Sequence, residues 1–533
     1  MSRKRALLWL GAGALALVLG LVVMLTLRIG DSRGQKRIAA GETLYREGKL
    51  LSGATLEAVV QGDVTVSGAQ FSCVACHGRS GMGSVEGARL APPVIPPYLD
   101  ASRKLKSRPR PPYTEAALAR AIRDGIDSGG NQLDRLMPRY RIGDADMTAL
   151  LEYLRTLSAA PSPGATMDEI HFATVVAPGV APQARETMLG VIRGFLRAKN
   201  GTSRDRRARH IASWPEYFGQ WVLHVWELEG PPLTWKRQLE SRYREQPVFA
   251  LVSGLGGDEW GPVHRFCESQ RIPCLLPNLE TPPDAGEDYY SLYFSRGAVL
   301  EAQAIAMHLP PLPEPQKVLQ VFRAGGAGER AALALAAALR SAGRAAPADL
   351  TLPASASLTS GQLRQHAADQ RATAVVLWLN RDEVGALQLS SLEGARVYLS
   401  STLLGADFAL PALVASNVFV AHPYALPGEA SQRFLRVSGW MTGQGLPPAK
   451  GSERRIADQT FFTMTLLNEG VMHVNKNFYR DYMLEVMDHF SGFESFSSLY
   501  PRLSFGPGQR YLSKGCHLVR LDGSDSAPEW HLP

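Results

Sequence analysis

The sequence predicts a multidomain protein with three parts in order: an N-terminal transmembrane helix, an all-α domain and a two-lobed α/β fold with parallel sheets. The chain of 533 residues is too long for one hydrophobic core, since domains usually contain ~100–200 residues. An uncharged apolar run opens the chain, and short apolar runs alternate with amphipathic helices after residue 170. With 45% hydrophobic and 20% charged residues, the composition is globular rather than disordered.

The first thirty residues predict where the chain resides. Arg3, Lys4 and Arg5 precede the uncharged residues 6–27, a run of ~22 residues where a membrane-spanning helix needs ~20. A basic flank stays in the cytoplasm, so we expect an inner-membrane anchor with the remaining chain in the periplasm. A cleaved signal peptide is the alternative, although residues 25–28 do not resemble a cleavage site. Both place the body in an exported compartment, so the net charge of +7 does not indicate a nucleic-acid partner.

Changes in composition divide the chain into four segments: an anchor at residues 1–30, a domain at 38–158, a linker at 159–168 and a domain at 169–525. The linker is rich in Pro, Ala and Ser, so we expect proteolysis to separate the two domains. The first domain should end in a helix capped by Asp144. Its apolar residues recur at helical spacing: Met147, Leu150, Leu151, Leu154 and Leu157.

Seven apolar runs in the second domain predict strands, and helical stretches such as residues 330–342 lie between most of them. The runs are residues 172–177, 221–226, 248–252, 318–322, 374–379, 397–399 and 418–421. Strands that alternate with helices predict parallel sheets covered on both faces, and the pattern is long enough for two lobes.

A C-x-x-C-H motif occupies residues 73–77. In this motif two thiols form thioether bonds to the haem vinyl groups, and the adjacent histidine is held beneath the iron as an axial ligand. A zinc site would need a second cysteine pair nearby, and a dithiol oxidoreductase would need a thioredoxin-like βαβ context. Neither is present in the sequence. We therefore expect one covalent haem c, bound by Cys73, Cys76 and His77.

The second axial ligand of the iron is expected to be Met137, which precedes a proline and the terminal helix. A thioether ligand raises the haem potential and leaves no open iron site for chemistry. Met82 and Met147 are the alternatives, and Met137 could also be a core residue. Met147 falls on the packed face of the terminal helix, and Met82 follows His77 too closely to reach the far face of the haem.

The segment from Gly41 to Leu157 resembles the class I monohaem cytochrome c domain. The resemblance rests on an opening helix at 41–45, the C-x-x-C-H motif with glycines at 78, 81 and 83, the Met137-Pro138 pair and a closing helix at 151–157. It implies a small helical fold, ligation of the iron by His77 and Met137, and electron transfer.

An insertion between Val85 and Tyr113 has no counterpart in that family pattern. Its basic residues form either a solvated loop or a docking patch for an acidic redox partner. They are Arg103, Lys104, Lys106, Arg108 and Arg110.

Residues 170–525 resemble the type I periplasmic binding fold, specifically the branched-chain amino acid and amide group of solute-binding proteins. The resemblance is carried by residues 248–254, 272–278, 289–308, 421–424 and 503–510. It implies two lobes with a ligand between them, at the carboxyl ends of the strands.

Candidate solute-binding residues in this second domain follow predicted strands. They are Ser253, Gly254, Ser400, Ser401 and Tyr424. A serine after a strand is also a common helix cap, so each has a structural alternative. The loop at 177–182 lacks the hydroxyl side chains that amino-acid binders offer, so the ligand need not be a zwitterion, and the lobes could instead dock a protein.

Together these features predict a membrane-anchored periplasmic c-type cytochrome that transfers single electrons between an exported dehydrogenase and the respiratory chain. Its expected partners are a redox protein, either a dehydrogenase or a terminal oxidase, and a small organic solute. The alternative is a solute-binding receptor of an ABC-type transport or sensing system with an accessory haem. The sequence contains no G-x-S-x-G, H-E-x-x-H or P-loop motif, and a haem peroxidase would need an open iron site, so we expect no enzyme.

Three cysteines remain outside the haem motif. Cys267 and Cys274 lie where a helix turns directly into a strand, which can bring residues seven apart within the ~4.4–6.8 Å Cα separation of a disulfide. We expect this disulfide, with Cys516 free. The alternative is three buried thiols that pack as small hydrophobic groups.

Overall fold

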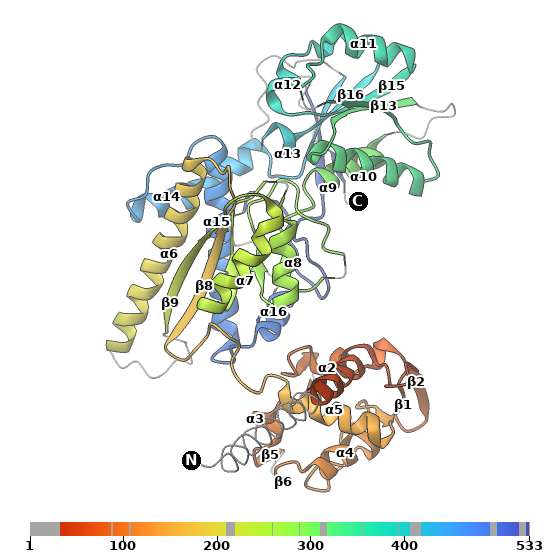
Figure 1. Cartoon of the computed structure of the whole chain (residues 1–533), viewed down its shortest axis with the longest axis vertical. Coiled ribbons are helices and arrows are strands. Elements are labelled where there is room, and N and C mark those ends of the chain that lie inside the picture. The colour runs from red at the N-terminus through yellow and green to blue at the C-terminus, as the bar shows by residue number, and fades with distance from the viewer. Residues whose placement is uncertain are drawn as a thin grey trace, which may run out of the picture. The chain divides into compact units, whose positions relative to one another are not determined.

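The computed structural model describes residues 32–531, except for 87–88, 106–107, 209–218, 258, 287, 310–316, 354, 393, 406–416, 491–497 and 522–528. The chain forms two compact units, and the boundary between them in the sequence lies between Pro161 and Ser162 (Figure 1). Within the described residues, no helix is both long enough and apolar enough to cross a bilayer. The predicted anchor at residues 1–30 lies outside these residues.

Helices form most of the first unit. They are a helix at residues 32–47, α2 (Val74–His77), α3 (Pro96–Leu99), α4 (Glu115–Asp124) and α5 (Asp144–Thr156). The predicted apolar face of α5 is confirmed, because Met147, Leu150 and Leu154 are buried. The cap of α5 is Gly143 rather than Asp144, which lies in the first helical turn and pairs with Arg123 at 2.7 Å.

The opening helix crosses α5 at close range. A Cβ atom on Gly41 would lie 2.1 Å from the carbonyl oxygen of Ala149, so only glycine allows this approach. One turn later, the rings of Tyr45 and Tyr153 pack with centroids 5.4 Å apart.

The first unit also contains strands, so the all-α prediction is wrong for these segments. A three-stranded antiparallel sheet has the order β2-β1-β7, from β1 (Glu57–Val60), β2 (Val64–Ser67) and β7 (Arg139–Arg141). Two short hairpins follow the C-x-x-C-H motif: β3 (Ser84–Glu86) with β4 (Arg89–Ala91), and β5 (Arg103–Leu105) with β6 (Arg108–Arg110). These strands contain only three or four residues each, which is too short for a pattern of alternating apolar residues to reveal them in the sequence.

The second unit begins with a parallel five-stranded sheet of order β12-β11-β10-β8-β9. Its strands are β8 (Glu169–Val176), β9 (Gln220–Glu227), β10 (Ala250–Val252), β11 (Cys274–Leu275) and β12 (Ser291–Leu292). One face of this sheet packs on α6 (Pro182–Ala208), α15 (Ser452–Val474) and α16 (Arg480–Asp488). The other face packs on α7 (Trp235–Glu245) and α8 (Gly261–Gln270), and α14 (Pro427–Gly443) packs on α15.

A second sheet forms the other lobe, with the order β14-β13-β15-β16-β17-β18-β19. Its parallel strands are β13 (Lys317–Arg323), β14 (Ala348–Leu352), β15 (Ala372–Trp378), β16 (Arg396–Ser400) and β17 (Val418–His422). At one edge, β18 (Cys516–Arg520) pairs antiparallel with β17, and β19 (Glu529–His531) pairs antiparallel with β18. Helices α9 (Ala298–His308) and α10 (Ala327–Ser341) cover one face. On the other face lie α11 (Ser360–Asp369) and α12 (Arg381–Gly385), while α13 (Ser401–Leu404) follows β16 directly.

Both sheets place their parallel strands in the doubly wound order 2-1-3-4-5, counted along the chain within each lobe. The chain passes between the lobes before α9, after β17 and before β18 (Figure 1). The predicted two-lobed α/β fold with parallel sheets is therefore confirmed. In this topology the carboxyl ends of the strands are the edge at which ligands usually bind.

Part of the predicted linker, residues 159–168, belongs to the second unit. The backbone NH of Ser162 donates to Phe478 O at 2.7 Å, and Arg480 donates to Pro163 O at 2.9 Å. A Cβ on Gly164 would lie 2.3 Å from Phe249 N. The linker thus packs closely on the lobe, and the close approach at Gly164 is possible because glycine has no side chain.

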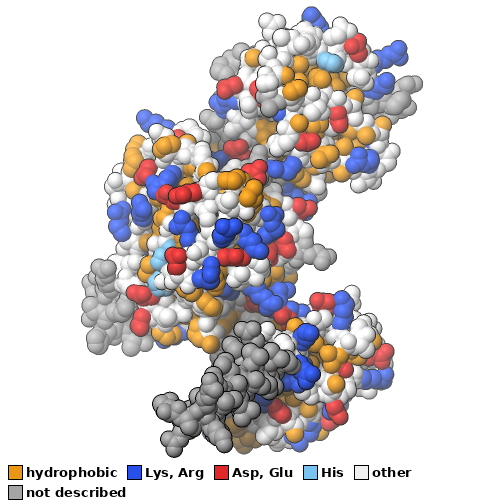
Figure 2. Space-filling model, viewed as in Figure 1, with side chains coloured by type: hydrophobic (Ala, Val, Ile, Leu, Met, Phe, Trp, Pro, Cys, Tyr) orange, Lys and Arg blue, Asp and Glu red, His pale blue; other side chains and the backbone are white. Residues whose placement is uncertain are grey.

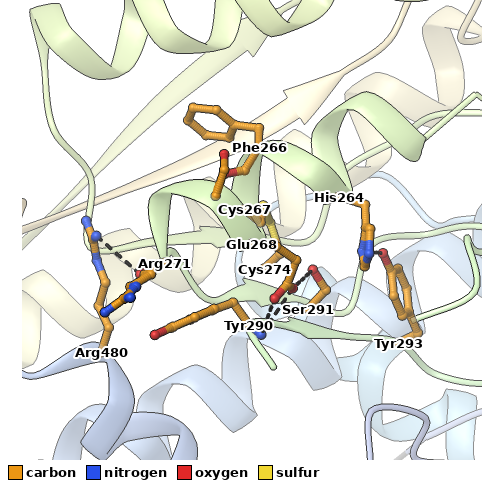
Figure 3. Close-up of a disulfide and its surroundings, with 11 residues drawn as sticks. His264, Phe266, Cys267, Glu268, Arg271, Cys274, Tyr290, Ser291, Tyr293 and Arg480 are labelled. Carbon is orange, nitrogen blue, oxygen red and sulfur yellow. Dashed lines mark hydrogen bonds between the residues drawn. A yellow bond between two sulfur atoms is a disulfide. The ribbon is translucent and has the colours of Figure 1, made fainter. Parts of the chain in front are cut away.

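The Cys267–Cys274 disulfide is confirmed, with Cα atoms 6.2 Å apart, and Cys516 is a free buried thiol. The disulfide joins the last turn of α8 to the start of β11 (Figure 3). Beside it, Glu268 accepts hydrogen bonds from the backbone NH of Tyr290 at 3.1 Å and from Ser291 Oγ at 2.7 Å. A covalent bond and a carboxylate therefore both connect α8 to its neighbouring strands.

Candidate functional site

The C-x-x-C-H motif forms a single helical turn, α2. The backbone NH of His77 donates to Cys73 O at 2.9 Å, and Gly78 ends the turn with a φ of 73°. Cys73 is partly exposed, Cys76 is exposed, and neither forms a disulfide. Both thiols are thus available on one turn for thioether bonds to a haem.

His77 is oriented as an iron ligand requires. Its side chain is buried, and Nδ1 lies 2.9 Å from Pro92 O, which can only accept a hydrogen bond. Nδ1 therefore carries the proton, and the lone pair remains on Nε2. Burial lowers the pKa of His77, although the Pro92 carbonyl raises it, so the imidazole is neutral. The geometry of this residue fits a proximal haem ligand.

Two glycines after the motif allow the chain to fold back so that Pro92 meets His77. A Cβ on Gly83, whose φ is 79°, would lie 2.1 Å from Ala91 O. A Cβ on Gly81 would lie 2.6 Å from a methyl carbon of Leu157. These close approaches explain why glycines occupy both positions in the sequence pattern.

Met137 lies in a turn just before β7 and is half-buried; its NH donates to Asp134 O at 3.1 Å. Three residues later, Tyr140 Oη donates to Phe71 O at 2.6 Å, next to the haem motif. The Met137 segment and the Cys73 segment are thereby brought together. Of the two alternative ligands, Met147 is buried in the core of α5, and the NH of Met82 donates to Ser80 Oγ within the loop after the motif.

The basic insertion contains a structural arginine. Arg110 is 2% exposed and donates to the carbonyls of Tyr98, Ala101 and Pro111. Arg110 thus belongs to the core of the insertion, while Arg103 lies over the ring of Tyr98 at 4.1 Å and Lys106 is outside the described residues. On the face shown in Figure 2, basic side chains are interspersed with acidic ones.

In the first lobe, protein groups surround the predicted solute residues. Ser253 is buried, accepts a hydrogen bond from Asn278 Nδ2 at 2.8 Å and lies 3.3 Å from Thr460 Oγ1. A Cβ on Gly254 would meet the ring of Trp260 at 2.7 Å. Helix α15, which carries Thr460, therefore contacts the carboxyl end of β10.

In the second lobe, Ser400 and Ser401 are buried against Glu301 of α9. Glu301 also accepts hydrogen bonds from the NH of Thr402 at 2.9 Å and from its hydroxyl at 2.8 Å. Tyr424 is buried and its hydroxyl interacts with Thr402. Ser400 is also the helix cap of α13, the structural alternative that the sequence left open.

Sequence reasoning missed Pro92 and Glu301. Pro92 acts through its backbone carbonyl, which no residue pattern marks. Glu301 is a buried carboxylate in the mostly apolar helix α9. An acidic residue on an apolar helix face was the sequence signal that could have identified it.

Comparison with known protein families gave a match of residues 65–158 to the family described as Cytochrome c. The match begins within β2, after the opening helix. Comparison with curated protein sequences gave no significant match.

Solved structures similar to the second unit are periplasmic binding proteins. A branched-chain amino acid ABC transporter protein from Thermus thermophilus with bound valine is 11% identical, with a TM-score of 0.49. The match covers 68% of this chain and 96% of the chain of that protein. A solute-binding protein from Rhodopseudomonas palustris BisB5 in complex with 3,4-dihydroxybenzoic acid is 13% identical, with a TM-score of 0.46 and the same coverage of both chains. The fold assignment rests on the strand orders rather than on these scores.

The C-x-x-C-H turn, the oriented histidine and the family match agree. Residues 65–158 belong to the cytochrome c family and bind haem c covalently, in a chain that continues into a two-lobed α/β unit with doubly wound parallel sheets.

Proposed function

We propose that the protein is a membrane-anchored periplasmic electron carrier, with His77 and Met137 as axial ligands of one covalent haem c. The single observation that carries this proposal is the His77 geometry: a buried, neutral imidazole whose Nδ1–H is fixed by Pro92 O, on the same turn as two available thiols. When bound, the haem supplies one-electron redox chemistry.

Five residues of this chain would bind and orient the haem. Cys73 and Cys76 would hold the haem covalently, His77 and Met137 would be its iron ligands, and Pro92 O fixes the histidine tautomer. With two protein ligands the iron would have no open site, which would favour electron transfer over peroxidase chemistry. The N-terminal apolar run at residues 6–27 supports membrane attachment. The electron donor proposed is an exported dehydrogenase, and the acceptor is a component of the respiratory chain.

We propose that the α/β unit recognises a small organic solute or the dehydrogenase itself. The two-lobed fold supports this, because ligands of such sheets bind at the carboxyl ends of their strands. Ser253, Ser400, Ser401 and Tyr424 lie near those ends, but their hydroxyls already contact protein groups. The contacts of Ser253, Ser400 and Ser401 lie within one lobe each, so a solute would have to replace these contacts at the carboxyl ends of the strands.

The test is a redox titration of the full-length protein, followed optically. A carrier should titrate as a single one-electron couple and should not consume added peroxide. Rapid peroxide turnover would contradict the proposal, because it requires an open iron site. Thermal-shift screening of the oxidised and reduced protein against organic solutes tests the alternative, a haem-bearing receptor. A solute whose affinity changes with haem redox state would favour that receptor.

A further inference from the structure

The side chain of Arg139 turns back onto the loop that carries Met137. Its guanidinium donates to three backbone carbonyls of this loop: Met137 O, Leu133 O at 3.2 Å and Asp134 O at 3.3 Å. No helix or strand includes residues 133–137. The backbone of this loop makes isolated hydrogen bonds instead: Leu133 NH donates to Gly125 O at 2.8 Å, Met137 NH donates to Asp134 O at 3.1 Å, and Arg135 O accepts from Gln61 NH at 3.0 Å. Arg139 thus links the two ends of the loop through its carbonyls.

A glycine makes room for this guanidinium. Gly125 ends α4 in the left-handed conformation, with a φ of 69°. A Cβ there would lie 1.8 Å from Arg139 Nε and 1.9 Å from Cζ. Any side chain at position 125 would therefore displace the guanidinium from the loop.

The backbone of Arg139 is fixed independently of its side chain. Arg139 pairs with Val59 in the register of β7 and β1, and the neighbouring Tyr140 donates to Phe71 O at 2.6 Å. The guanidinium therefore extends from an anchored strand to a loop that lies outside the regular helices and strands.

We propose that Arg139 is the positioning residue of the axial-ligand loop: its guanidinium fixes the carbonyls of Leu133, Asp134 and Met137, and so holds the Met137 thioether against the iron. The inference rests on the proposed function, because it requires Met137 to be the ligand. A guanidinium presents five donors in a rigid fork, whereas an ammonium group is a single point charge. Lysine could therefore preserve the charge at this position but not the three-carbonyl contact.

The test uses the full-length holoprotein and its oxidised sulfur-to-iron absorption band. Imidazole is added as a competing iron ligand, and the concentration that removes half of the band is measured. For Arg139→Lys we expect this concentration to fall about tenfold, which corresponds to a tenfold change in the ligand-exchange equilibrium. The matched control is Arg141→Lys on the same strand, where an exposed arginine pairs with Glu57 and the concentration should not change.

A second pair of variants covers the case in which Arg139→Lys does not accumulate. Gly125→Ala places a methyl group where the guanidinium lies and should reproduce the loss. Gly130→Ala imposes similar backbone strain, with a φ of 81°, but no atom lies within 4 Å of its Cβ position. It should leave the imidazole titration unchanged.

The outcomes separate this inference from the ligand assignment. Met137→Ala should abolish the band in every background. If it does, and Arg139→Lys and Gly125→Ala both titrate like the wild type, Arg139 has no positioning role and the ligand assignment stands. Lower thermal stability with an unchanged imidazole titration would likewise overturn the inference, since it shows only a structural role. A band that survives Met137→Ala overturns both.

Discussion

The haem motif and the hydrogen-bond network around Glu301 hold their key residues in opposite ways. Cys73, Cys76 and His77 lie on one helical turn, so five consecutive residues determine the chemistry. Glu301 instead meets Ser400, Ser401 and Thr402 across about a hundred residues of chain, because α9 begins where β16 ends, at the same edge of the lobe. A local motif can be recognised in one sequence, whereas a network assembled by strand order becomes visible only in the fold.

Removing the local motif should have the largest effect. In Cys73→Ala/Cys76→Ala, both thioether bonds are absent, so we expect complete loss of covalently attached haem. Haem staining after denaturing electrophoresis measures this directly. The control is Cys516→Ala, which removes a buried thiol of the second unit and should retain full staining. Covalent haem in the double variant would show that another residue attaches it.

Removing a buried arginine side chain from the second unit should have the next largest effect. Arg480 is 7% exposed and donates to Val248 O at 2.6 Å, Pro163 O at 2.9 Å and Phe249 O at 3.0 Å. Arg480→Ala leaves these carbonyls without a donor, so the free energy of unfolding should fall by about 3 kcal/mol or more. Denaturant unfolding measures it, with the exposed Arg364→Ala expected within ~0.5 kcal/mol of the wild type. Equal stabilities for the two variants would contradict this role.

The hydrogen-bond network around Glu301 should make stability depend on pH. Burial raises the pKa of Glu301 from its ordinary value to about 7, even though hydrogen bonds from Ser400, Ser401 and Thr402 oppose the shift. Because the folded pKa exceeds the unfolded one, its stabilising contribution is present below pH ~4.5 and is lost as pH rises to about 7, by roughly 3 kcal/mol.

Glu301→Gln should flatten the unfolding free energy across this pH window, as measured by denaturant unfolding at several pH values. Burial also raises the pKa of Asp458 to about 7, so a second component with the same sign should remain and disappear in Asp458→Asn. The exposed Glu245→Gln serves as the control. An unchanged pH profile in Glu301→Gln would mean that this carboxyl group does not titrate there.

The disulfide should have the smallest of these effects. It closes a loop with a sequence separation of 7, so its removal should cost about 2 kcal/mol. Mass spectrometry after alkylation of the unfolded holoprotein should find one reactive thiol, Cys516, without reduction and three with it. A crosslink from Cys516 to either partner would contradict the Cys267–Cys274 pairing. Unfolding of Cys267→Ala/Cys274→Ala measures the stability change.

The fold was predictable where strands are continuous apolar runs. All seven predicted runs overlap strands, because strands buried on both faces of a parallel sheet need no polar alternation. Strands β11 and β12 contain two residues each, and β14 is half exposed with Pro353 after it. Such segments carry too short or too polar a pattern to distinguish them from loops.

The candidate site was predictable only where its residues lie close together in the sequence, as in the C-x-x-C-H motif. Cys73, Cys76 and His77 follow from spacing, but the contact of His77 with Pro92 depends on a loop that folds back through glycines. Ser400 and Ser401 follow a strand as predicted, but their hydroxyls contact Glu301. A position directly after a strand therefore predicts that the residue lies at the edge of the sheet. It does not predict which group the side chain contacts there.

The most direct test of the electron-carrier proposal is the sulfur-to-iron absorption band of the oxidised protein, recorded together with its reduction potential. The proposal predicts that the wild type shows the band, and that Met137→Ala abolishes it and lowers the potential, because a thioether ligand stabilises reduced iron. A matched Met82→Ala variant should keep both properties. A band that persists in Met137→Ala, or disappears in Met82→Ala, would contradict the assignment.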